Sequence, residues 1–200
     1  MSFRSLALLA VAVPVVASAQ TPAAAPTTLP TVDQQIAAAV LPLPKDMRDG
    51  ATVMGYRTAD KLEVLRKGKG TMTCLALFAV REDFHVACYH NSLERFMARG
   101  RELRAQGVKG EQVDSVRFKE IKAGKLVIPK QAALYSLTGP KTAWDPATGN
   151  VKGANPLGVV YMPNATPESV GLTTNPVPGM PWMMFPGTPK AHIMIIGSMN

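Results

Sequence analysis

Two cysteines and two histidines form the most compact group of reactive residue types in the chain. Cys74 and Cys88 are the only cysteines among the 200 residues, and His85 and His90 lie on either side of Cys88. Thiolate and imidazole groups are ligands of zinc and copper, so the four residues suit a metal site. The alternative is a disulfide between the two cysteines, which is typical of proteins that leave the reducing cytoplasm.

The spacing of the two cysteines fits opposite positions in a β-hairpin. With a loop over residues 79–83, Cys74 would face Cys88 on the neighbouring strand. Such partners have Cβ atoms about 4.5–5.5 Å apart, which a small adjustment brings to the distance of a disulfide. Alternation along the strand places His90 with the cysteines and His85 on the opposite face, so at most three of the four metal ligands would gather. We therefore predict a disulfide, with a zinc or copper site as the alternative.

A second group of metal-binding residue types lies near the C-terminus. Met183, Met184, His192 and Met194 bring thioether and imidazole groups into one short segment. Together with His90 they are the candidate ligands for copper(I), which soft thioether ligands select. Methionine also fills irregular cores, and a buried loop over a sheet would use it in that way. We predict core packing here, with copper as the alternative cofactor.

Basic side chains concentrate in the middle of the chain, where an amphipathic helix is predicted. Residues 91–130 hold ten Lys and Arg against five Asp and Glu, and the whole chain has a formal net charge of +8. The predicted binding residues are Arg95, Arg99, Arg101 and Arg104, with Lys119 and Lys122 as additional candidates. A basic face attracts an acidic protein, an acidic polysaccharide or an anionic membrane surface. Nucleic acid is not expected as a partner because the chain is predicted to be exported.

Residues 1–19 have the three parts of a secretory signal peptide. Arg4 supplies a positive charge, residues 6–17 form an uncharged apolar run, and the small residues 17–19 precede a cleavage site at Gln20. The apolar run is shorter than the roughly 20 residues of a membrane-spanning helix. We predict cleavage near Ala19–Gln20 and a periplasmic or secreted protein that has no transmembrane span after processing.

The remainder of the chain is predicted to form a flexible linker and one domain. Residues 20–32 are rich in Pro, Ala and Thr and can bury little, which predicts a mobile tether. Residues 33–200 are predicted to form a single α+β domain, with a mostly antiparallel sheet, two amphipathic helices on one side and long Pro/Gly-rich loops. Helices are expected over 34–40, 91–106 and 111–123, the first capped by Asp33 and the second by a capping box of Asn91 and Glu94. Strands are expected over 51–56, 62–65, 71–78, 84–89, 126–128, 132–138, 157–162 and 192–196.

Three stretches of the sequence resemble a group of exported bacterial proteins of unknown function. They are MRDGATV at 47–53, FHVACYHNSLERFMARGRELRAQG at 84–107 and MFPGTPKAHIMI at 184–195. The resemblance implies that the mature chain is one unit, and it implies no catalytic residue.

No recognised catalytic signature accompanies these features. The chain lacks a phosphate-binding glycine-rich loop, a Gly-x-Ser-x-Gly motif and a His-Glu-x-x-His motif. We therefore predict a binding or interaction protein without catalytic residues. The alternatives are a copper or zinc protein and an enzyme of unrecognised type built around His90.

Overall fold

The computed structural model describes residues 29–177 and 179–197. The predicted leader and residues 20–28 of the predicted linker lie outside the described residues. The helices are α1 (Val32–Ala39), α2 (Lys45–Arg48), α3 (Glu94–Ala105), α4 (Gln112–Lys122) and α5 (Pro167–Val170), with the 3-10 turns η1 (Leu77–Val80), η2 (Asn91–Leu93) and η3 (Lys141–Ala143). The strands are β1 (Thr52–Thr58), β2 (Lys61–Arg66), β3 (Met72–Leu75), β4 (Asp83–His90), β5 (Ala132–Pro140), β6 (Asn155–Tyr161), β7 (Trp182–Met184) and β8 (His192–Ile196).

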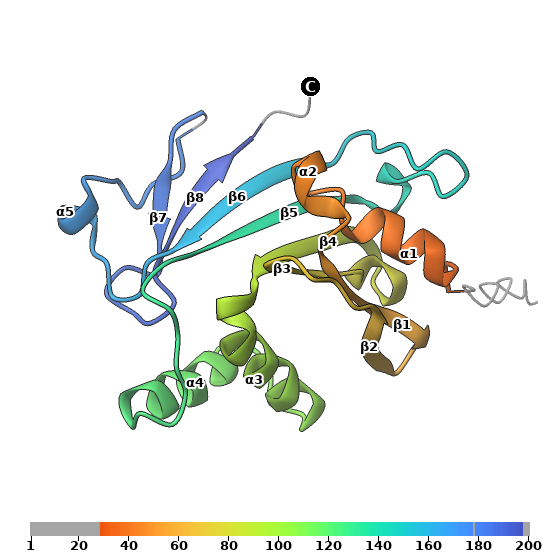
Figure 1. Ribbon diagram of the computed structural model, residues 1–200. Coiled ribbons are helices and arrows are strands. Elements are labelled where there is room, and N and C mark those ends of the chain that lie inside the picture. Colours follow the sequence, from red (N-terminus) through yellow and green to blue (C-terminus); the bar gives the residue numbers. More distant parts are fainter. Residues whose placement is uncertain (1–28, 178, 198–200) are drawn as a thin grey trace, which may run out of the picture.

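The strands form one eight-stranded sheet in the order β2-β1-β3-β4-β5-β6-β8-β7. Neighbouring strands are antiparallel, except for the parallel pair β1 and β3. Figure 1 shows α1 and α2 on one side of the sheet and α3 and α4 on the other. The predicted α+β class, with the two amphipathic helices on one side, is therefore confirmed.

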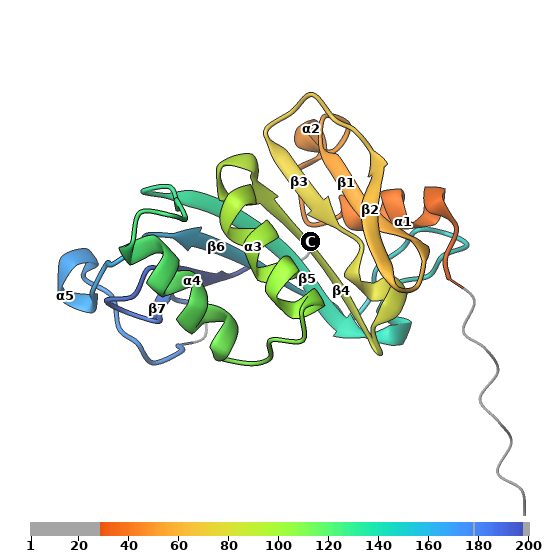
Figure 2. The same cartoon turned by 90° about the horizontal axis from the view of Figure 1, so that it is seen from below.

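Each face of the sheet contributes to its own hydrophobic core, because side chains alternate between the faces along every strand. On the α1 face, Cys74, Val86 and Cys88 pack with Ala38 and Ala39 of α1. On the opposite face, seen from the front in Figure 2, the helices α3 and α4 cover a core that contains Leu75, Tyr89, Phe96, Val159 and Tyr161. None of the helices in the two described ranges is long and apolar enough to cross a bilayer.

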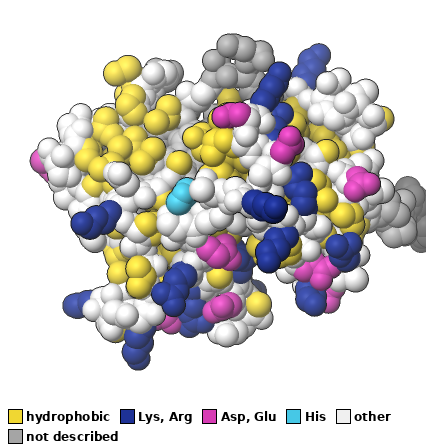
Figure 3. All heavy atoms as spheres, viewed as in Figure 1, with side chains coloured by type: hydrophobic (Ala, Val, Ile, Leu, Met, Phe, Trp, Pro, Cys, Tyr) yellow, Lys and Arg dark blue, Asp and Glu magenta, His cyan; other side chains and the backbone are white. Residues whose placement is uncertain are grey.

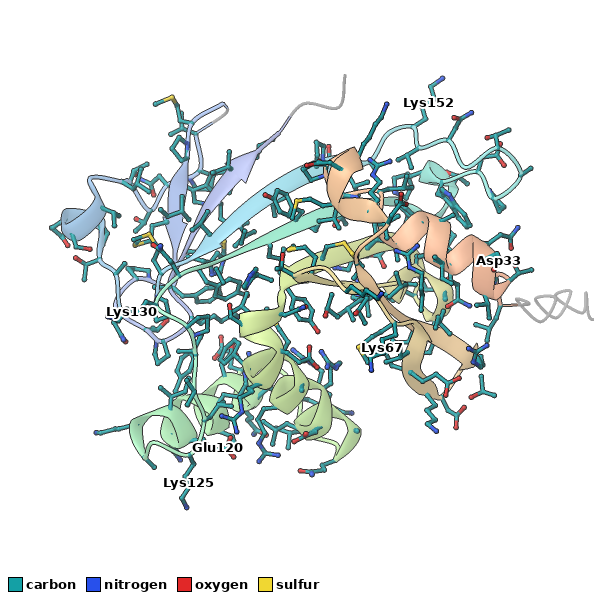
Figure 4. All side chains as sticks on the ribbon, in the orientation of Figure 1. Asp33, Lys67, Glu120, Lys125, Lys130 and Lys152 are labelled. Carbon is teal, nitrogen blue, oxygen red and sulfur yellow. A yellow bond between two sulfur atoms is a disulfide. The ribbon has the colours of Figure 1, made fainter. Side chains whose placement is uncertain are left out.

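The cap of α1 lies two residues earlier than predicted, at Thr31 instead of Asp33. The Thr31 side chain accepts a hydrogen bond from the Gln34 amide at 3.2 Å, and the Gln34 side chain accepts one from the Thr31 amide at 2.9 Å. This reciprocal pair is a capping box that satisfies two amide groups at the helix start. Asp33, predicted as the cap, instead lies exposed in the first turn (Figure 4).

The predicted capping box of Asn91 and Glu94 is wrong. The turn η2 precedes α3, and the His90 imidazole accepts the hydrogen bond from the Ser92 amide at 3.2 Å. Asn91 instead accepts a hydrogen bond from the Thr73 hydroxyl at 2.8 Å, which ties the start of the helix to β3. The Glu94 carboxylate instead accepts hydrogen bonds from Tyr89 and Arg101.

The predicted strand 71–78 ends at Leu75, and the chain continues into η1. Two long-range hydrogen bonds fix this bend. The Ala76 amide donates to the Met54 carbonyl at 2.9 Å, and the Lys141 ammonium donates to the Phe78 carbonyl at 2.8 Å. The predicted strand 126–128 is also wrong, because no strand forms there, whereas β7 forms inside a Pro/Gly-rich stretch that was expected to be a loop.

Candidate functional site

A cavity of about 790 Å³ lies between the β1–β2 hairpin, η1 and α3. This volume is within the range of about 300–1,000 Å³ that is usual for small-molecule sites. Its larger apolar side chains come from four separate elements and are Leu62, Leu75, Leu77, Val80 and Met97. Its polar lining includes the cations Lys61, Arg81, Arg101 and Arg104, the anions Asp60 and Glu102, and Tyr56. The lining therefore combines an apolar surface with four cations and two anions. Glu94, Asp83 and Glu63, which lie outside the lining, pair with Arg101, Arg81 and Lys61.

One side of α3 forms a wall of this cavity. Met97, Arg101, Arg104 and Ala105 line the cavity, and their spacing places them on one face of a helix. The neighbouring face, which contains Phe96 and Leu103, is buried against the sheet. One face of α3 therefore packs against the sheet through Phe96 and Leu103, and the adjacent face lines the cavity.

Arg101 is held in place by a buried tyrosine and a carboxylate. Its Nη1 donates to the Tyr89 hydroxyl at 2.9 Å, and its Nη2 contacts Glu94 Oε1 at 2.6 Å. The Tyr89 hydroxyl in turn donates to Glu94 Oε2 at 2.5 Å. Tyr89 is only 1 % exposed, so the phenol is a fixed support for the guanidinium. Because the three groups bond one another, Arg101 presents a preoriented cation to the cavity.

Burial and the neighbouring carboxylate both raise the pKa of the Tyr89 phenol above its ordinary value. The phenol is therefore neutral at physiological pH and keeps the proton that it donates to Glu94. Burial acts to lower the pKa of Arg101, but Tyr89 and Glu94 outweigh burial and raise it. The cation at the cavity wall is consequently permanent.

The opposite wall carries a second cation. Arg81 follows η1 and donates to both carboxylate oxygens of Asp83, with Nε–Oδ1 at 2.6 Å and Nη2–Oδ2 at 2.9 Å. Burial raises the pKa of the nearby Tyr56 phenol, and the charges of Arg101 and Arg81 act in the opposite direction. Both guanidinium groups are therefore close enough to Tyr56 for their fields to act at its hydroxyl.

The four arginines predicted as binding residues occupy different environments. Arg101 and Arg104 line the cavity, and among the described residues Arg104 has no ion-pair partner. Arg99 is bonded to Glu120, with Nη2–Oε1 at 2.7 Å, which joins α3 to α4. Arg95 is exposed and lies outside the cavity lining. Half of the predicted set thus belongs to the cavity.

The surrounding surface is rich in charged groups. Figure 3 shows Lys and Arg side chains over the helices and the β1–β2 hairpin, whereas hydrophobic side chains gather over β6, β7 and β8. Lys119 and Lys122, the additional candidates, are exposed on α4, and Lys125 just beyond it points away from the body of the molecule (Figure 4). These lysines lie outside the cavity lining. Tyr56, Arg81 and Met97 were not among the predicted site residues, although the helical spacing of Met97 with Arg101 was a usable signal.

The cysteine and histidine group is a disulfide with two separate histidines. Cys74 and Cys88 are bonded to each other, and their Cα atoms are 3.9 Å apart. The predicted register is confirmed, because Cys74 and Cys88 are opposite each other in the β3–β4 ladder. His85 Nδ1 is 2.7 Å from the Thr138 hydroxyl, and His90 Nδ1 accepts from the Ser92 hydroxyl at 2.8 Å. The thiolates needed for the alternative zinc or copper site are therefore consumed by the disulfide.

The candidate copper ligands divide between different faces of the sheet. Met184 is opposite His192 in the β7–β8 ladder, whereas Met183 is opposite Ile193 and points to the other face. Met194 follows His192 by two positions and shares its face. His90 belongs to β4, which is separated from β8 by β5 and β6. Within the described ranges, no group of three or more His, Cys, Asp and Glu side chains is placed to hold a metal ion.

Comparison of the chain with protein families, with curated proteins and with solved structures finds no match.

Proposed function

We propose that this chain is an exported binding protein that takes up an acidic ligand with an apolar part in the cavity between α3 and the β1–β2 hairpin. The observation that carries the proposal is the pairing of an apolar lining with Arg101 and Arg104 on one wall. A ligand with a carboxylate, sulfonate or phosphate group would reach these guanidinium groups while its apolar part covers Leu62, Leu75 and Met97. The acidic group belongs either to a small molecule or to a side chain of an acidic partner.

The guanidinium group of Arg104 favours an anion over a cation in the cavity. Arg101 is already oriented by Tyr89 and Glu94, so binding does not have to immobilise it. Arg104 has an unpaired charge among the described residues, and a guanidinium binds a carboxylate or phosphate through two parallel hydrogen bonds. The chemistry of the α3 wall therefore supports recognition of an acid group.

Export is part of the proposal. The leader-like residues 1–19 and the pairing of both cysteines suit an oxidising compartment. A periplasmic or secreted binding protein would meet acidic polysaccharide, acidic proteins and amphiphilic acids released from the cell envelope. Cleavage near Gln20 is the processing step that this proposal requires.

The experiment is a binding titration with the aromatic sulfonate dye anilinonaphthalenesulfonate, followed by displacement with three amphiphiles of equal chain length. Decanoate should displace the dye, whereas decanol and decyltrimethylammonium should do so at least about tenfold less well, because a charged hydrogen bond contributes about 1.5–3 kcal/mol. Binding should also weaken as salt rises, since the cavity is open to solvent ions. Equal displacement by the cationic amphiphile, or binding that is insensitive to salt, would overturn the proposal.

Matched variants of α3 separate the cavity from the general charge of the helix. Arg104→Met should weaken decanoate binding, whereas Arg95→Met, which removes the same charge outside the cavity, should leave it unchanged. Arg101→Met tests the oriented cation, and near-ultraviolet circular dichroism checks that its fold is retained. An equal loss of binding in the Arg95 and Arg104 variants would show nonspecific attraction and contradict a cavity site.

A further inference from the structure

The strands β7 and β8 bring two methionines and a histidine to one face at the far end of the sheet from the cavity. The β7–β8 register places Met184 directly opposite His192. Met194 lies two positions beyond His192 on β8, and residues two apart on a strand share a face. Directly opposed residues have Cβ atoms about 4.5–5.5 Å apart, which is within reach of long thioether side chains.

One ring nitrogen of His192, Nδ1, is hydrogen-bonded to the backbone, and among the described residues the other, Nε2, has no such bond. Its Nδ1 is 2.7 Å from the Lys190 carbonyl oxygen, which only accepts hydrogen bonds, so Nδ1 carries the proton. The lone pair of the ring is therefore on Nε2. A hydrogen bond from one ring nitrogen to a carbonyl is the usual support for a histidine that binds metal through the other nitrogen.

Aromatic neighbours fix the orientation of this ring. The centroid of His192 is 5.2 Å from that of Tyr161 and 5.6 Å from that of Phe185. The ammonium nitrogen of Lys190 lies 2.8 Å from Asp114 Oδ2, and this carboxylate also pairs with Arg117. The imidazole is thus preoriented, and the charge of Lys190 is partly compensated.

The two methionines on this face differ from their neighbour on the other face. Met184 and Met194 are half-buried, whereas Met183 is 1 % exposed. A half-buried thioether has three rotatable bonds with which to turn its sulfur toward a metal ion. Met194 also packs against the core that contains Val159 and Tyr161, whereas Met183 is fully packed on the other face. Met184 on β7 is therefore a candidate ligand, and the adjacent Met183 on the other face serves as its control.

We propose that Met184, His192 and Met194 bind one copper(I) ion on this face of the sheet. Two thioether sulfurs and one imidazole nitrogen form a soft ligand set, which suits copper(I) and offers zinc none of its usual thiolate or carboxylate ligands. Binding involves no change in oxidation state, and the ion displaces no proton because Nε2 is unprotonated. This site is separate from the proposed acid-binding cavity, and neither proposal depends on the other.

The test is an anaerobic titration in which the folded protein competes with a chromophoric chelator for copper(I). The wild type should withdraw one copper(I) ion per chain. Met184→Leu and Met194→Leu, which preserve most of the side-chain volume, should each bind at least about tenfold more weakly, because even supporting groups around a metal contribute about 10–100-fold. Met183→Leu alters the adjacent methionine on the opposite face and should bind as the wild type does.

Three results would overturn the copper site. They are a wild type that withdraws no copper(I), a Met183→Leu variant that loses as much affinity as Met184→Leu, and zinc(II) binding of the same strength to the wild type. The near-ultraviolet circular dichroism of the same preparations should be unchanged in all three variants. That measurement shows whether each variant is folded, and it does not depend on the proposed ligand cavity.

Discussion

Lys190 donates a hydrogen bond of 2.8 Å to Asp114, which joins the loop before β8 to the first turn of α4 across 76 positions of sequence. The second oxygen of Asp114 pairs with Arg117, whose guanidinium lies 3.8 Å over the centre of the Phe96 ring. One carboxylate therefore pairs with two cations from different parts of the chain. The arrangement fastens α4 both to α3 and to the C-terminal strands.

Substitution of Asp114 should cost more stability than substitution of its more exposed partner Lys190. The side chain of Arg117 is 5 % exposed and that of Lys190 is 23 % exposed. Asp114→Asn leaves a buried guanidinium uncompensated and should lower the free energy of unfolding by about 3 kcal/mol. Lys190→Met removes a more exposed partner and should cost about 1 kcal/mol. Urea denaturation measures both, and equal losses would contradict the role assigned to Arg117.

The Asp114 carboxylate should also make the stability of the fold sensitive to acid. Burial acts to raise the pKa of Asp114, but the hydrogen bonds and charges of Lys190 and Arg117 outweigh burial and hold it below its ordinary value of 3.8. A pKa that is lower in the folded state stabilises the fold above the ordinary carboxyl range, and this stabilisation is lost as pH falls through the folded-state pKa. The Asp114→Asn variant should therefore show a smaller loss of stability below pH 4 than the wild type.

The side chain of Gln35 is predicted to stabilise the fold by holding β1 against α1. It is completely buried, and its side chain accepts from the Tyr56 amide at 2.8 Å and donates to the Tyr56 carbonyl at 2.7 Å. Gln35→Leu would leave both backbone groups without these partners, at about 1–3 kcal/mol for each. We expect a loss of at least about 2 kcal/mol in urea denaturation.

Gln35→Glu is a second variant that tests this contact. It keeps the length of the side chain and one acceptor oxygen but removes the donor to the Tyr56 carbonyl. Its loss of stability should also be large, because a carboxylate at this fully buried position has no cation in the observed contacts. A Gln35→Leu variant as stable as the wild type would show that Tyr56 finds other partners.

Strand pairing near the cysteines was predictable because it depends on short-range geometry. The alternation of side chains and the short connection predicted that Cys74 would face Cys88, and the ladder has this register. The end of β3 was not predictable in the same way. Its continuation into η1 depends on Met54 and Lys141, which approach from distant parts of the chain.

The cavity illustrates the same division. Arg101 and Arg104, which were predicted as binding residues from local sequence, lie on the α3 wall of the cavity. Met97 lines the same wall but was not among the predicted site residues. The other wall, with Tyr56 and Arg81, exists only because β1 and β2 lie beyond β3 at the edge of the sheet. The strand β7 was missed for a similar reason, since its three residues become a strand only by pairing with β8.

The disulfide should contribute substantially to stability. Cys74 and Cys88 are fully buried and close a loop with a sequence separation of 14. On the chain-entropy model, a loop of this size stabilises the fold by about 3 kcal/mol. The Cys74→Ala/Cys88→Ala variant should therefore unfold at a clearly lower denaturant concentration than the oxidised wild type.

Reduced wild type provides the comparison for this variant. Protein that is unfolded, reduced and refolded in the presence of reductant should match the double alanine variant to within about 1 kcal/mol. If the double variant and the oxidised wild type share one unfolding midpoint, the bond contributes no net stability. Mass spectrometry of the untreated protein, two hydrogens lighter than the reduced form, checks that the starting material contains the bond.

Two histidines predict a loss of stability in mildly acidic solution. Burial lowers the pKa of His85, with a further lowering by the charge of Arg81, and burial also lowers the pKa of His192 below the ordinary value of 6.5. The unfolded chain therefore binds more protons than the folded chain in this range, so stability falls as pH decreases through 6.5 toward the folded-state values. Unfolding free energies measured between pH 7.5 and 5.5 should decrease, and the decrease should be smaller in His85→Gln and smallest in the variant that also carries His192→Phe. A pH profile that is flat in the wild type, or unchanged in the double variant, would exclude these two histidines as its source.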